Sequence, residues 1–406
     1  MGVTPAATLR STAEIRARSQ HLLTRARAGD SDWFTVHDGA MAAAAAEVAA
    51  LTAARFPDLV IPFHSRWRHF EAGGVDRKSA LDGLLGDLDG AGRARAMIDL
   101  TVVSVLLDAG AGPDWSYREA DTGLAFTRSE GLGVASWHAF TAGTFSSDPG
   151  HPLQADAAGL TGLDAGALGA AFQLGPDNPL VGFEGRVDLL RRLGAALADQ
   201  PTVFGTPGRP GGLFDLLVTD PSAPAVAAHD ILSALLSSMS RIWLADNAID
   251  GEPLGDCWRH DAVPGAGATA GWVPFHKLSQ WLTYSLLEPF GWSGVQVTGL
   301  DALTGLPEYR NGGLFLDTGV LRLRDPGWTR RGWTPADELV VEWRALTVAL
   351  LDELAVLVRE RLGVTDEQLP LACVLEGGSW AAGRAFAQRL RGGLPPLTVI
   401  SDGTVF

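Results

Sequence analysis

The feature that most constrains the fold is a long amphipathic stretch near the carboxyl end, residues 336–363. In "ADELVVEWRALTVALLDELAVLVRERLG" large apolar side chains recur every three or four residues, at Trp343, Leu346, Leu350, Leu354 and Leu357. This spacing places them on one face of an α-helix, and such a face must be buried against other elements. We therefore expect the longest helix of the protein here, packed inside a helical body.

Helical patterns recur along the rest of the chain, whereas strand signals are short. Helix-forming composition or apolar periodicity marks most of the first 55 residues and the stretches 91–108, 129–143, 178–197, 225–246, 275–289 and 379–390. Hairpins are predicted over 115–128, over 309–323 around Asn311–Gly312, and in the tail 397–406, which should be ordered and turn at Asp402–Gly403. The chain is thus predicted to be mainly α with small β-hairpins, as one compact domain over 1–406. Proline and glycine are dense at 201–225, where two helical lobes could join.

Composition narrows the class of partner. The 32 Lys and Arg residues against 47 Asp and Glu give a net charge of −15, which repels a phosphodiester backbone and argues against nucleic-acid binding. No apolar run reaches the roughly 18 residues of a membrane-spanning helix, and the first residues lack a secretion signal. The two cysteines, Cys257 and Cys373, are far apart, so a disulfide framework is not expected. We expect a cytoplasmic protein that acts on a small molecule.

The most unusual short segment is "FHSRWRHFEAGG", residues 63–74, which lies in a proline- and glycine-bounded stretch expected to be mainly extended loop. As a metal site it would use His64, His69 and Glu71, although their spacing matches no metal motif. As an anion site it would use Arg66, Arg68 and His69, because guanidinium groups match phosphate oxygens. Ion pairing on a surface loop is the third interpretation. No nucleotide-binding loop is found, and no cofactor is expected.

Two carboxylates follow predicted apolar helices. Asp246 closes "SRIWLAD" and Asp108 closes "VVSVLLD". A carboxylate at a helix C-terminus meets the negative end of the helix dipole, and acidic caps belong at the other end. Two interpretations remain open for each position, a functional carboxylate or an exposed acid just past the helix end.

Several longer motifs resemble a family of unknown function that acts in uracil catabolism in fungi and bacteria. They are "SRWRHFEAGG", "VVSVLLDAGAG", "TRSEGLGVASW", "NPLVGFEGRVDLL", "WVPFHKLSQWLTYSLLEP", "YRNGGLFLDTGV" and "LEGGSW" with the terminal "VISDGTVF". The resemblance extends from about residue 8 to the last residue. It implies a place in the urea-releasing route of pyrimidine degradation but supplies no chemistry.

A weaker resemblance is to queuosine-salvage proteins, which are nucleoside 5′-phosphate N-glycosidases of a helical, DNA-glycosylase-like fold. The order of features is similar, with "LLDAGAGPDW", "GTFSSDP", "EGRVDLL", "LADNA" containing Asp246, and "KLSQ" at 277–280. One departure is Phe275–His276, where those proteins carry Asp-Tyr. If that aspartate is essential there, its role here must pass to Asp246 or another acid.

Together the two resemblances imply an N-ribosyl hydrolase that frees urea from ribosylurea or its 5′-phosphate. Because such hydrolysis passes through an oxocarbenium-like state, a carboxylate near C1′ is needed, and we assign Asp246 with Asp108 or Glu130 in reserve. His276 would protonate the departing nitrogen. The substrate-binding residues expected are His64, Arg66, Arg68, His69, Glu71, Lys277 and Gln280, with Arg66, Arg68, His69 and Lys277 on the phosphate.

All these residues should then gather in one pocket formed by residues 64–71, Asp246 and the 275–280 segment. Two alternatives remain open. One is a metal-dependent hydrolase of the same route that uses His64, His69 and Glu71. The other is a non-catalytic partner of a pathway enzyme.

Overall fold

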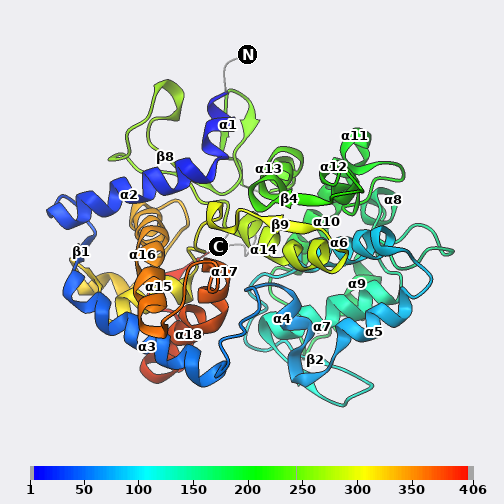
Figure 1. Ribbon diagram of the computed structural model, residues 1–406, viewed down its shortest axis with the longest axis horizontal. Coiled ribbons are helices and arrows are strands. Elements are labelled where there is room, and N and C mark those ends of the chain that lie inside the picture. The colour runs from blue at the N-terminus through cyan, green and yellow to red at the C-terminus, as the bar shows by residue number, and fades with distance from the viewer. Residues whose placement is uncertain (1–3, 244, 401–406) are drawn as a thin grey trace.

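The computed structural model describes residues 4–243 and 245–400 of the chain, and helices dominate it, as predicted (Figure 1). One set, here called the end group, comes from the two ends of the chain: α1 (Pro5–Leu9), α2 (Thr12–Ala28), α3 (Met41–Arg55), α15 (Tyr309–Asp317), α16 (Glu338–Leu362), α17 (Leu371–Val374) and α18 (Trp380–Arg391). The other set, the middle group, is α4 (Trp67–Phe70), α5 (Arg77–Leu84), α6 (Gly90–Leu106), α7 (Arg128–Thr141), α8 (Ala157–Thr161), α9 (Ala165–Ala171), α10 (Phe183–Ala198), α11 (Pro201–Phe204), α12 (Gly212–Leu217), α13 (Ala228–Met239) and α14 (Lys277–Trp292).

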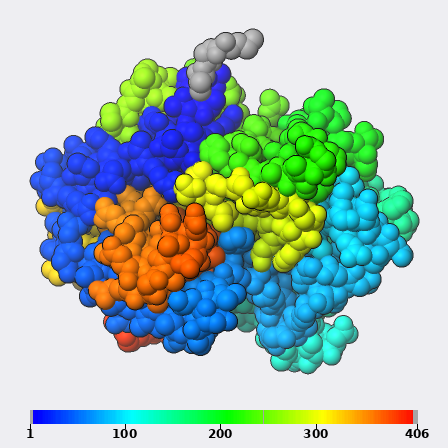
Figure 2. Space-filling model, in the orientation of Figure 1, coloured from blue at the N-terminus to red at the C-terminus, as the bar shows by residue number. Residues whose placement is uncertain are grey.

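The two groups lie side by side, with the ends of the chain on one side of Figure 1 and the middle on the other. On the face seen in Figure 2, the orange surface of the end group touches the yellow surface of the middle group. The chain crosses between the groups after α3, in the segment that leads into α4. The crossing leads into residues 63–74, the segment that is most unusual in the sequence.

The long amphipathic helix is confirmed as α16, the organising element of the end group. Its apolar face packs against α2, α3 and α15, and Trp343, Leu346, Leu350 and Leu354 are buried. Gly363, at a left-handed φ of 69°, ends the helix, which is the usual role of glycine after a C-terminus. Burial of this face follows directly from the three- and four-residue spacing.

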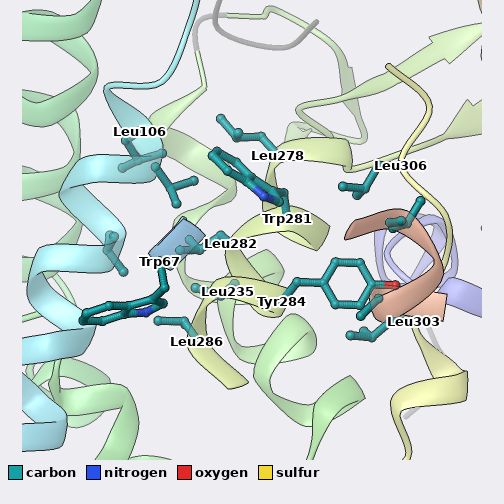
Figure 3. Packing of buried hydrophobic residues seen from close by; sticks show 14 of the residues in the cluster. Trp67, Leu106, Leu235, Leu278, Trp281, Leu282, Tyr284, Leu286, Leu303 and Leu306 are labelled. Carbon is teal, nitrogen blue, oxygen red and sulfur yellow. The ribbon is translucent and has the colours of Figure 1, made fainter. Parts of the chain in front are cut away.

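The core of the middle group is built around α14, which packs against α6 and α13. Figure 3 shows Leu278, Trp281, Leu282 and Leu286 of this helix among buried side chains of its neighbours. The predicted end at Pro289 is wrong, because α14 continues to Trp292. A proline cannot bond the carbonyl four residues earlier, and here that carbonyl, of Ser285, accepts the indole N–H of Trp67 at 3.1 Å.

The strands form six two-stranded sheets in the described residues. The pairs are β1 (Phe34–Val36) with β10 (Leu321–Leu323), β2 (Tyr117–Arg118) with β3 (Ala125–Phe126), β4 (Ala225–Ala227) with β9 (Gln296–Thr298), β5 (Ala248–Ile249) with β6 (Glu252–Pro253), β7 (Cys257–Arg259) with β8 (Trp272–Pro274), and β11 (Gly332–Trp333) with β12 (Thr398–Val399). The hairpin predicted over 115–128 is confirmed as β2–β3, with Tyr117 opposite Phe126. The predicted tail hairpin at Asp402–Gly403 lies outside the described residues.

The hairpin predicted over 309–323 is wrong. Residues 309–317 form α15, and β10 pairs with the distant β1. The Glu308 side chain caps this helix by accepting the backbone N–H groups of Arg310 and Asn311 at 2.8 and 2.6 Å. At Gly312 an added Cβ would lie 2.7 Å from the Trp343 ring, so this glycine serves close helix packing rather than a turn.

One further prediction about the middle group needs correction. The helix expected over 225–246 ends at Met239, and a short 3-10 turn (Ser240–Ile242) follows, so Asp246 does not close a helix. The 201–225 segment contains α11 and α12, and α12 packs on α6 and α13 within the middle group. None of the helices in the described ranges combines the length and apolar character that crossing a bilayer requires.

Replacing Gly383 by alanine is expected to destabilise the end group severely. In α18 an added Cβ at this position would lie 2.1 Å from the carbonyl oxygen of Arg310, a backbone atom that cannot swing away. Overpacking of this kind costs about 3 kcal/mol or more of unfolding free energy, measurable by denaturant titration. The matched control is Gly83→Ala in exposed α5, where nothing lies within 4 Å and a gain of roughly 0.5–1 kcal/mol is expected. Equal effects of the two substitutions would contradict this packing.

Candidate functional site

The "FHSRWRHF" stretch folds as the short helix α4 rather than as extended loop. Its start is fixed on α14, because the backbone N–H of Arg66 donates to Ser285 Oγ at 2.9 Å and the Trp67 indole to the Ser285 carbonyl. Residues three apart on a helix share a face, and residues two apart do not. The charged side chains of the stretch are therefore distributed to two sides of α4.

Arg66 points to the interior of the middle group and is fully buried. Its Nε donates to Ser104 Oγ at 2.6 Å, and its Nη1 lies 3.2 Å from His69 Nδ1 and 3.1 Å from Asp108 Oδ1. Burial lowers the pKa of this guanidinium, and the charge of Asp108 opposes that effect. Asp108 directly follows the apolar helix α6, as predicted, so this helix end carries a buried ion pair.

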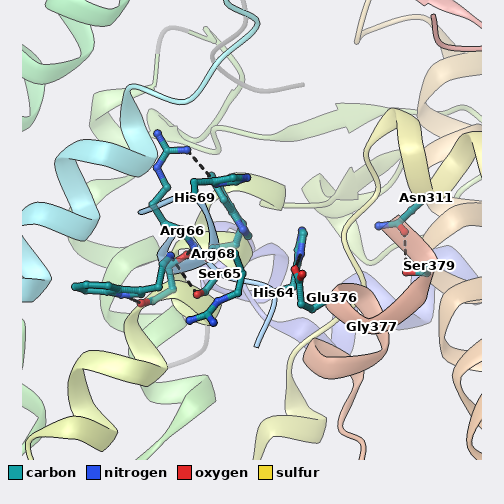
Figure 4. A network of polar contacts seen from close by, with 12 residues as sticks. His64, Ser65, Arg66, Arg68, His69, Asn311, Glu376, Gly377 and Ser379 are labelled. Atoms are coloured by element: carbon teal, nitrogen blue, oxygen red, sulfur yellow. Dashed lines mark hydrogen bonds and ion pairs between the residues drawn. The ribbon is translucent and has the colours of Figure 1, made fainter. Parts of the chain in front are cut away.

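Arg68 points the opposite way. Its guanidinium donates to Glu71 at 3.0 Å and to Glu288 of α14 at 2.6 Å. Figure 4 shows the Arg66 and Arg68 side chains directed to different sides of the segment. The predicted clamp, in which both arginines hold one anion, is therefore not formed, and burial of Glu288 raises its pKa to about 7.

His69 shares the face of Arg66. Its Nδ1 accepts from Arg66, and its ring meets the Trp281 ring edge-on at 5.8 Å. Burial, and next the charge of Arg66, lower the pKa of His69 to about 3, so this imidazole is neutral. Glu130 of α7 interacts with the same two residues and forms an ion pair with Arg384 of α18 at 3.0 Å. The site thus joins the middle group to the end group.

His64 precedes α4 and faces the end group. Its Nδ1 lies 2.8 Å from Glu376 Oε2, and its ring is 5.9 Å from that of Trp380. Glu376 belongs to a π-helical turn (Leu375–Ser379) and also pairs with Arg55. Burial would raise the pKa of Glu376, but the hydrogen bond with His64 and the charge of Arg55 lower it overall. In Figure 4 the His64–Glu376 pair lies between the Arg66–His69 pair and the Asn311–Ser379 pair.

These partners do not fit the metal interpretation. His64 is turned to Glu376, His69 to Arg66 and Glu71 to Arg68, so the three supposed ligands do not converge. Across residues 4–243 and 245–400 no three His, Cys, Asp or Glu side chains are grouped closely enough to hold a metal ion.

Asp108 lies beside several buried polar atoms whose hydrogen-bonding capacity is unused. Arg66 Nη2 and Trp281 Nε1 are buried and have no hydrogen-bond partner among the described residues, and Asp108 Oδ1 is buried with only its ion-pair contact to Arg66. Leaving such atoms without partners costs about 1–3 kcal/mol each, so each of them calls for an explanation, and a bound ligand is one. Lys277 and Tyr309 lie within electrostatic range of Asp108. The arrangement is suited to a small polar ligand that brings both donors and acceptors.

The remaining predicted site residues near the start of α14 are His276, Lys277 and Gln280, and each has contacts within the fold. His276, in a left-handed conformation with φ 48°, has its Nε2 3.0 Å from the Leu9 carbonyl, and burial lowers its pKa. The Gln280 amide bonds to Thr304 at both its ends. Lys277 donates its backbone N–H to Asp256, and burial lowers the pKa of its ammonium. Lys277 lies within electrostatic range of Asp108.

Asp246 lies in an exposed loop. Among the described residues its carboxylate has no hydrogen bond or ion pair, so nothing links it to residues 64–71. Sequence reasoning also missed Trp281, Tyr309, Arg310, Glu376 and Arg384, all near the candidate site. The only one of these regions with a signal in the sequence was the glycine pair of "EGGSW". Gly378 of this pair packs closely on α3, where an added Cβ would lie 2.4 Å from Thr52 Oγ1 and 2.7 Å from Val48 Cγ1.

Comparison with known proteins places these residues in a family. The chain is 42% identical over 381 residues to "Uracil catabolism protein 4" of Lachancea kluyveri, an alignment that covers 85% of both chains. It is 39% identical to "Protein urg3" of Schizosaccharomyces pombe over the full length of both proteins. The family described as "Protein of unknown function (DUF1688)" matches residues 8–406, so the chain belongs to that family.

Proposed function

We propose that the protein is an N-ribosyl hydrolase of uracil degradation, which breaks the C1′–N bond of a ribosylurea and releases urea. The observation that carries this proposal is the Asp108 carboxylate, whose Oδ1 is held by Arg66 and whose Oδ2 has no hydrogen bond to any described residue. The Trp281 ring, whose indole N–H is also unpartnered in the described residues, lies 5.8 Å from the same Arg66 guanidinium. The similarity to a protein named for uracil catabolism supports the pathway. Asp108 takes the role that the sequence assigned to Asp246.

Asp108 would stabilise the positive charge that develops at C1′ and the ring oxygen as the bond to nitrogen breaks. Arg66 holds this carboxylate in place through the 3.1 Å contact, and Ser104 and His69 fix Arg66 in turn. A water molecule adds its oxygen to C1′ and loses one proton, which replaces the proton that the site donates to the departing nitrogen. The products are ribose and urea, so the reaction consumes one water per bond.

The departing nitrogen needs a proton, and His64 is the better donor than His276. Glu376 holds Nδ1 of His64, which leaves Nε2 without a hydrogen bond to any described residue. A carboxylate that orients a histidine in this way is a frequent device of acid–base catalysis. His276, in contrast, uses its Nε2 on the Leu9 carbonyl.

The DNA-glycosylase-like fold is part of the same proposal. A mainly helical body in which two helix groups meet at the candidate site agrees with a DNA-glycosylase-like arrangement, which the resemblance to N-glycosidases implies. The metal-dependent alternative has less support, because His64, His69 and Glu71 have separate partners.

The proposal is tested by mixing purified protein with ribosylurea and assaying urea and free ribose together. We expect the two products in equal amounts at a rate proportional to protein concentration. If no urea is released from either ribosylurea or its 5′-phosphate, the proposal is contradicted and the non-catalytic interpretation is favoured.

A further inference from the structure

One buried arginine of the site forms no ion pair with any described residue. Arg310, on α15, is 5% exposed, and its Nη1 is buried without a hydrogen bond to any described residue. No carboxylate in the described ranges forms an ion pair with it. A guanidinium is always charged and offers five donors, so this environment is incomplete as it stands.

The other buried arginines of the described residues are compensated, most of them by a carboxylate. Arg77 forms a two-point contact with Glu119 at 2.8 and 2.7 Å, and Arg344 forms another with Asp256 at 2.7 Å for both bonds. Such forks are the usual way in which proteins compensate a buried guanidinium. Arg186, which has no carboxylate partner, instead donates to the carbonyls of Leu107, Val181 and Gly110. Arg310 has neither kind of acceptor among the described residues, so its guanidinium is the exception.

The position of Arg310 is fixed by its backbone and by two aromatic rings. Its guanidinium carbon lies 4.9 Å from the Tyr309 ring centroid and 5.0 Å from that of Trp380. Glu308 is close by, but its carboxylate accepts backbone N–H groups at the start of α15 instead of the guanidinium. Gly383 lets α18 approach the Arg310 carbonyl closely, as described above. The aromatic rings hold the cation without neutralising it.

Arg310 belongs to the same site as Asp108. Burial raises the pKa of the Tyr309 phenol, and the charges of Arg310 and Asp108 both act on it, so Tyr309 lies near both. Arg384, which pairs with Glu130, lies over the Trp380 ring at 5.5 Å. A ligand that reaches Asp108 with one end can therefore present an anionic group to Arg310 with the other.

We propose that Arg310 binds the phosphate of a phosphorylated ribosyl substrate, so that the protein acts on a ribosylurea 5′-phosphate rather than on the free ribosylurea. The identity of the sugar in this inference rests on the proposed function, whereas the binding of an anion at Arg310 does not. A phosphate monoester supplies the two adjacent oxygens that a guanidinium fork prefers. In this arrangement the phosphate lies at Arg310 and C1′ lies at Asp108, with Tyr309 between the two ends.

The first test uses inorganic phosphate and needs no turnover. We expect phosphate to raise the melting temperature of the wild-type protein and to have no effect on Arg310→Met. Without phosphate, Arg310→Met should melt at or above the wild-type temperature, because it removes an uncompensated buried charge. The matched control, Arg77→Met, should melt lower, because Glu119 loses its fork. A loss of stability in Arg310→Met as large as that in Arg77→Met would overturn the inference.

The second test compares substrates. Wild-type kcat/KM should be higher for ribosylurea 5′-phosphate than for ribosylurea, and Arg310→Met should reduce that preference by about 10- to 100-fold, the loss expected for a charge-assisted hydrogen bond. Equal preference in the variant and the wild type would contradict phosphate binding at Arg310. If neither compound is hydrolysed but the phosphate-dependent melting shift still requires Arg310, the proposed function fails while the anion site stands.

Discussion

Asp108→Asn is expected to lower the turnover of ribosylurea substrates by about 10²- to 10³-fold, the effect of removing one preorganised electrostatic contact to a transition state. The substitution keeps the shape of the side chain but removes the charge that faces the developing cation. KM should change little, because the sugar is neutral at C1′ before the bond breaks. The measurement is kcat at saturating substrate.

Asp246→Asn is the matched control for Asp108→Asn. Asp246 is the other carboxylate that the sequence favours, and it lies in an exposed loop without a bonded partner in the described part of the chain. Asp246→Asn should therefore keep near-wild-type turnover. The reverse outcome, with Asp246→Asn inactive and Asp108→Asn active, would reject the site proposed here. Thermal melting of both variants separates lost chemistry from lost folding, since Asp108→Asn leaves Arg66 without its counter-ion.

His64→Gln is expected to lower hydrolysis of ribosylurea by about 10²- to 10⁴-fold, the usual contribution of general acid catalysis. Urea is a poor leaving group unless its nitrogen receives a proton, and His64 Nε2 is the proposed donor. A substrate whose leaving group departs as a stable anion, such as 4-nitrophenyl ribofuranoside, needs no proton. Its cleavage by His64→Gln should therefore stay within a few-fold of wild type.

The matched control is His260→Gln. His260 is also buried against a glutamate, Glu342 at 3.0 Å, but its Nδ1 accepts the Ala262 N–H at 3.2 Å, so both ring nitrogens are used structurally. This substitution should affect stability and leave the leaving-group dependence unchanged. If His64→Gln slows both substrates equally, His64 positions other groups and is not the proton donor.

The elements with strong local signals could be predicted from the sequence. The periodicity of residues 336–363 led directly to α16, and the turn residues near Gly123 led to β2–β3. The failed hairpin had an equally good local signal, Asn311–Gly312, but distant contacts decide that region. Trp343 packs against Gly312, and β1 supplies the strand partner of β10. Neither contact can be read from the neighbouring residues.

In the candidate site, too, local signals were predicted and distant contacts were not. The sequence located Arg66, His69, Asp108 and Glu130, which the fold does bring together. It also joined Arg66 and Arg68 in one clamp, because an extended loop was expected there. Once the stretch is helical, residues two positions apart face different sides, and Arg68 turns to Glu288.

Arg310 illustrates what the sequence could not supply. Its importance comes from a missing partner, and only the packing of α15 against α18 reveals that no described carboxylate reaches it. Local pattern reasoning identifies groups that are present, such as helix caps and charged clusters. It cannot identify an unmet charge, because pairing depends on residues far away in the chain.

The central claim, attack of water at C1′ of the sugar, is tested most directly by running the reaction in ¹⁸O-labelled water. If the C1′–N bond is hydrolysed, the label appears at C1 of the released sugar and urea stays unlabelled, provided that the sugar is trapped before its anomeric oxygen exchanges. Asp108→Asn should show the same labelling at a much lower rate. Label in carbonate, with ammonia and a ribosylamine as the other products, would mean attack on the urea carbonyl instead and would contradict the account.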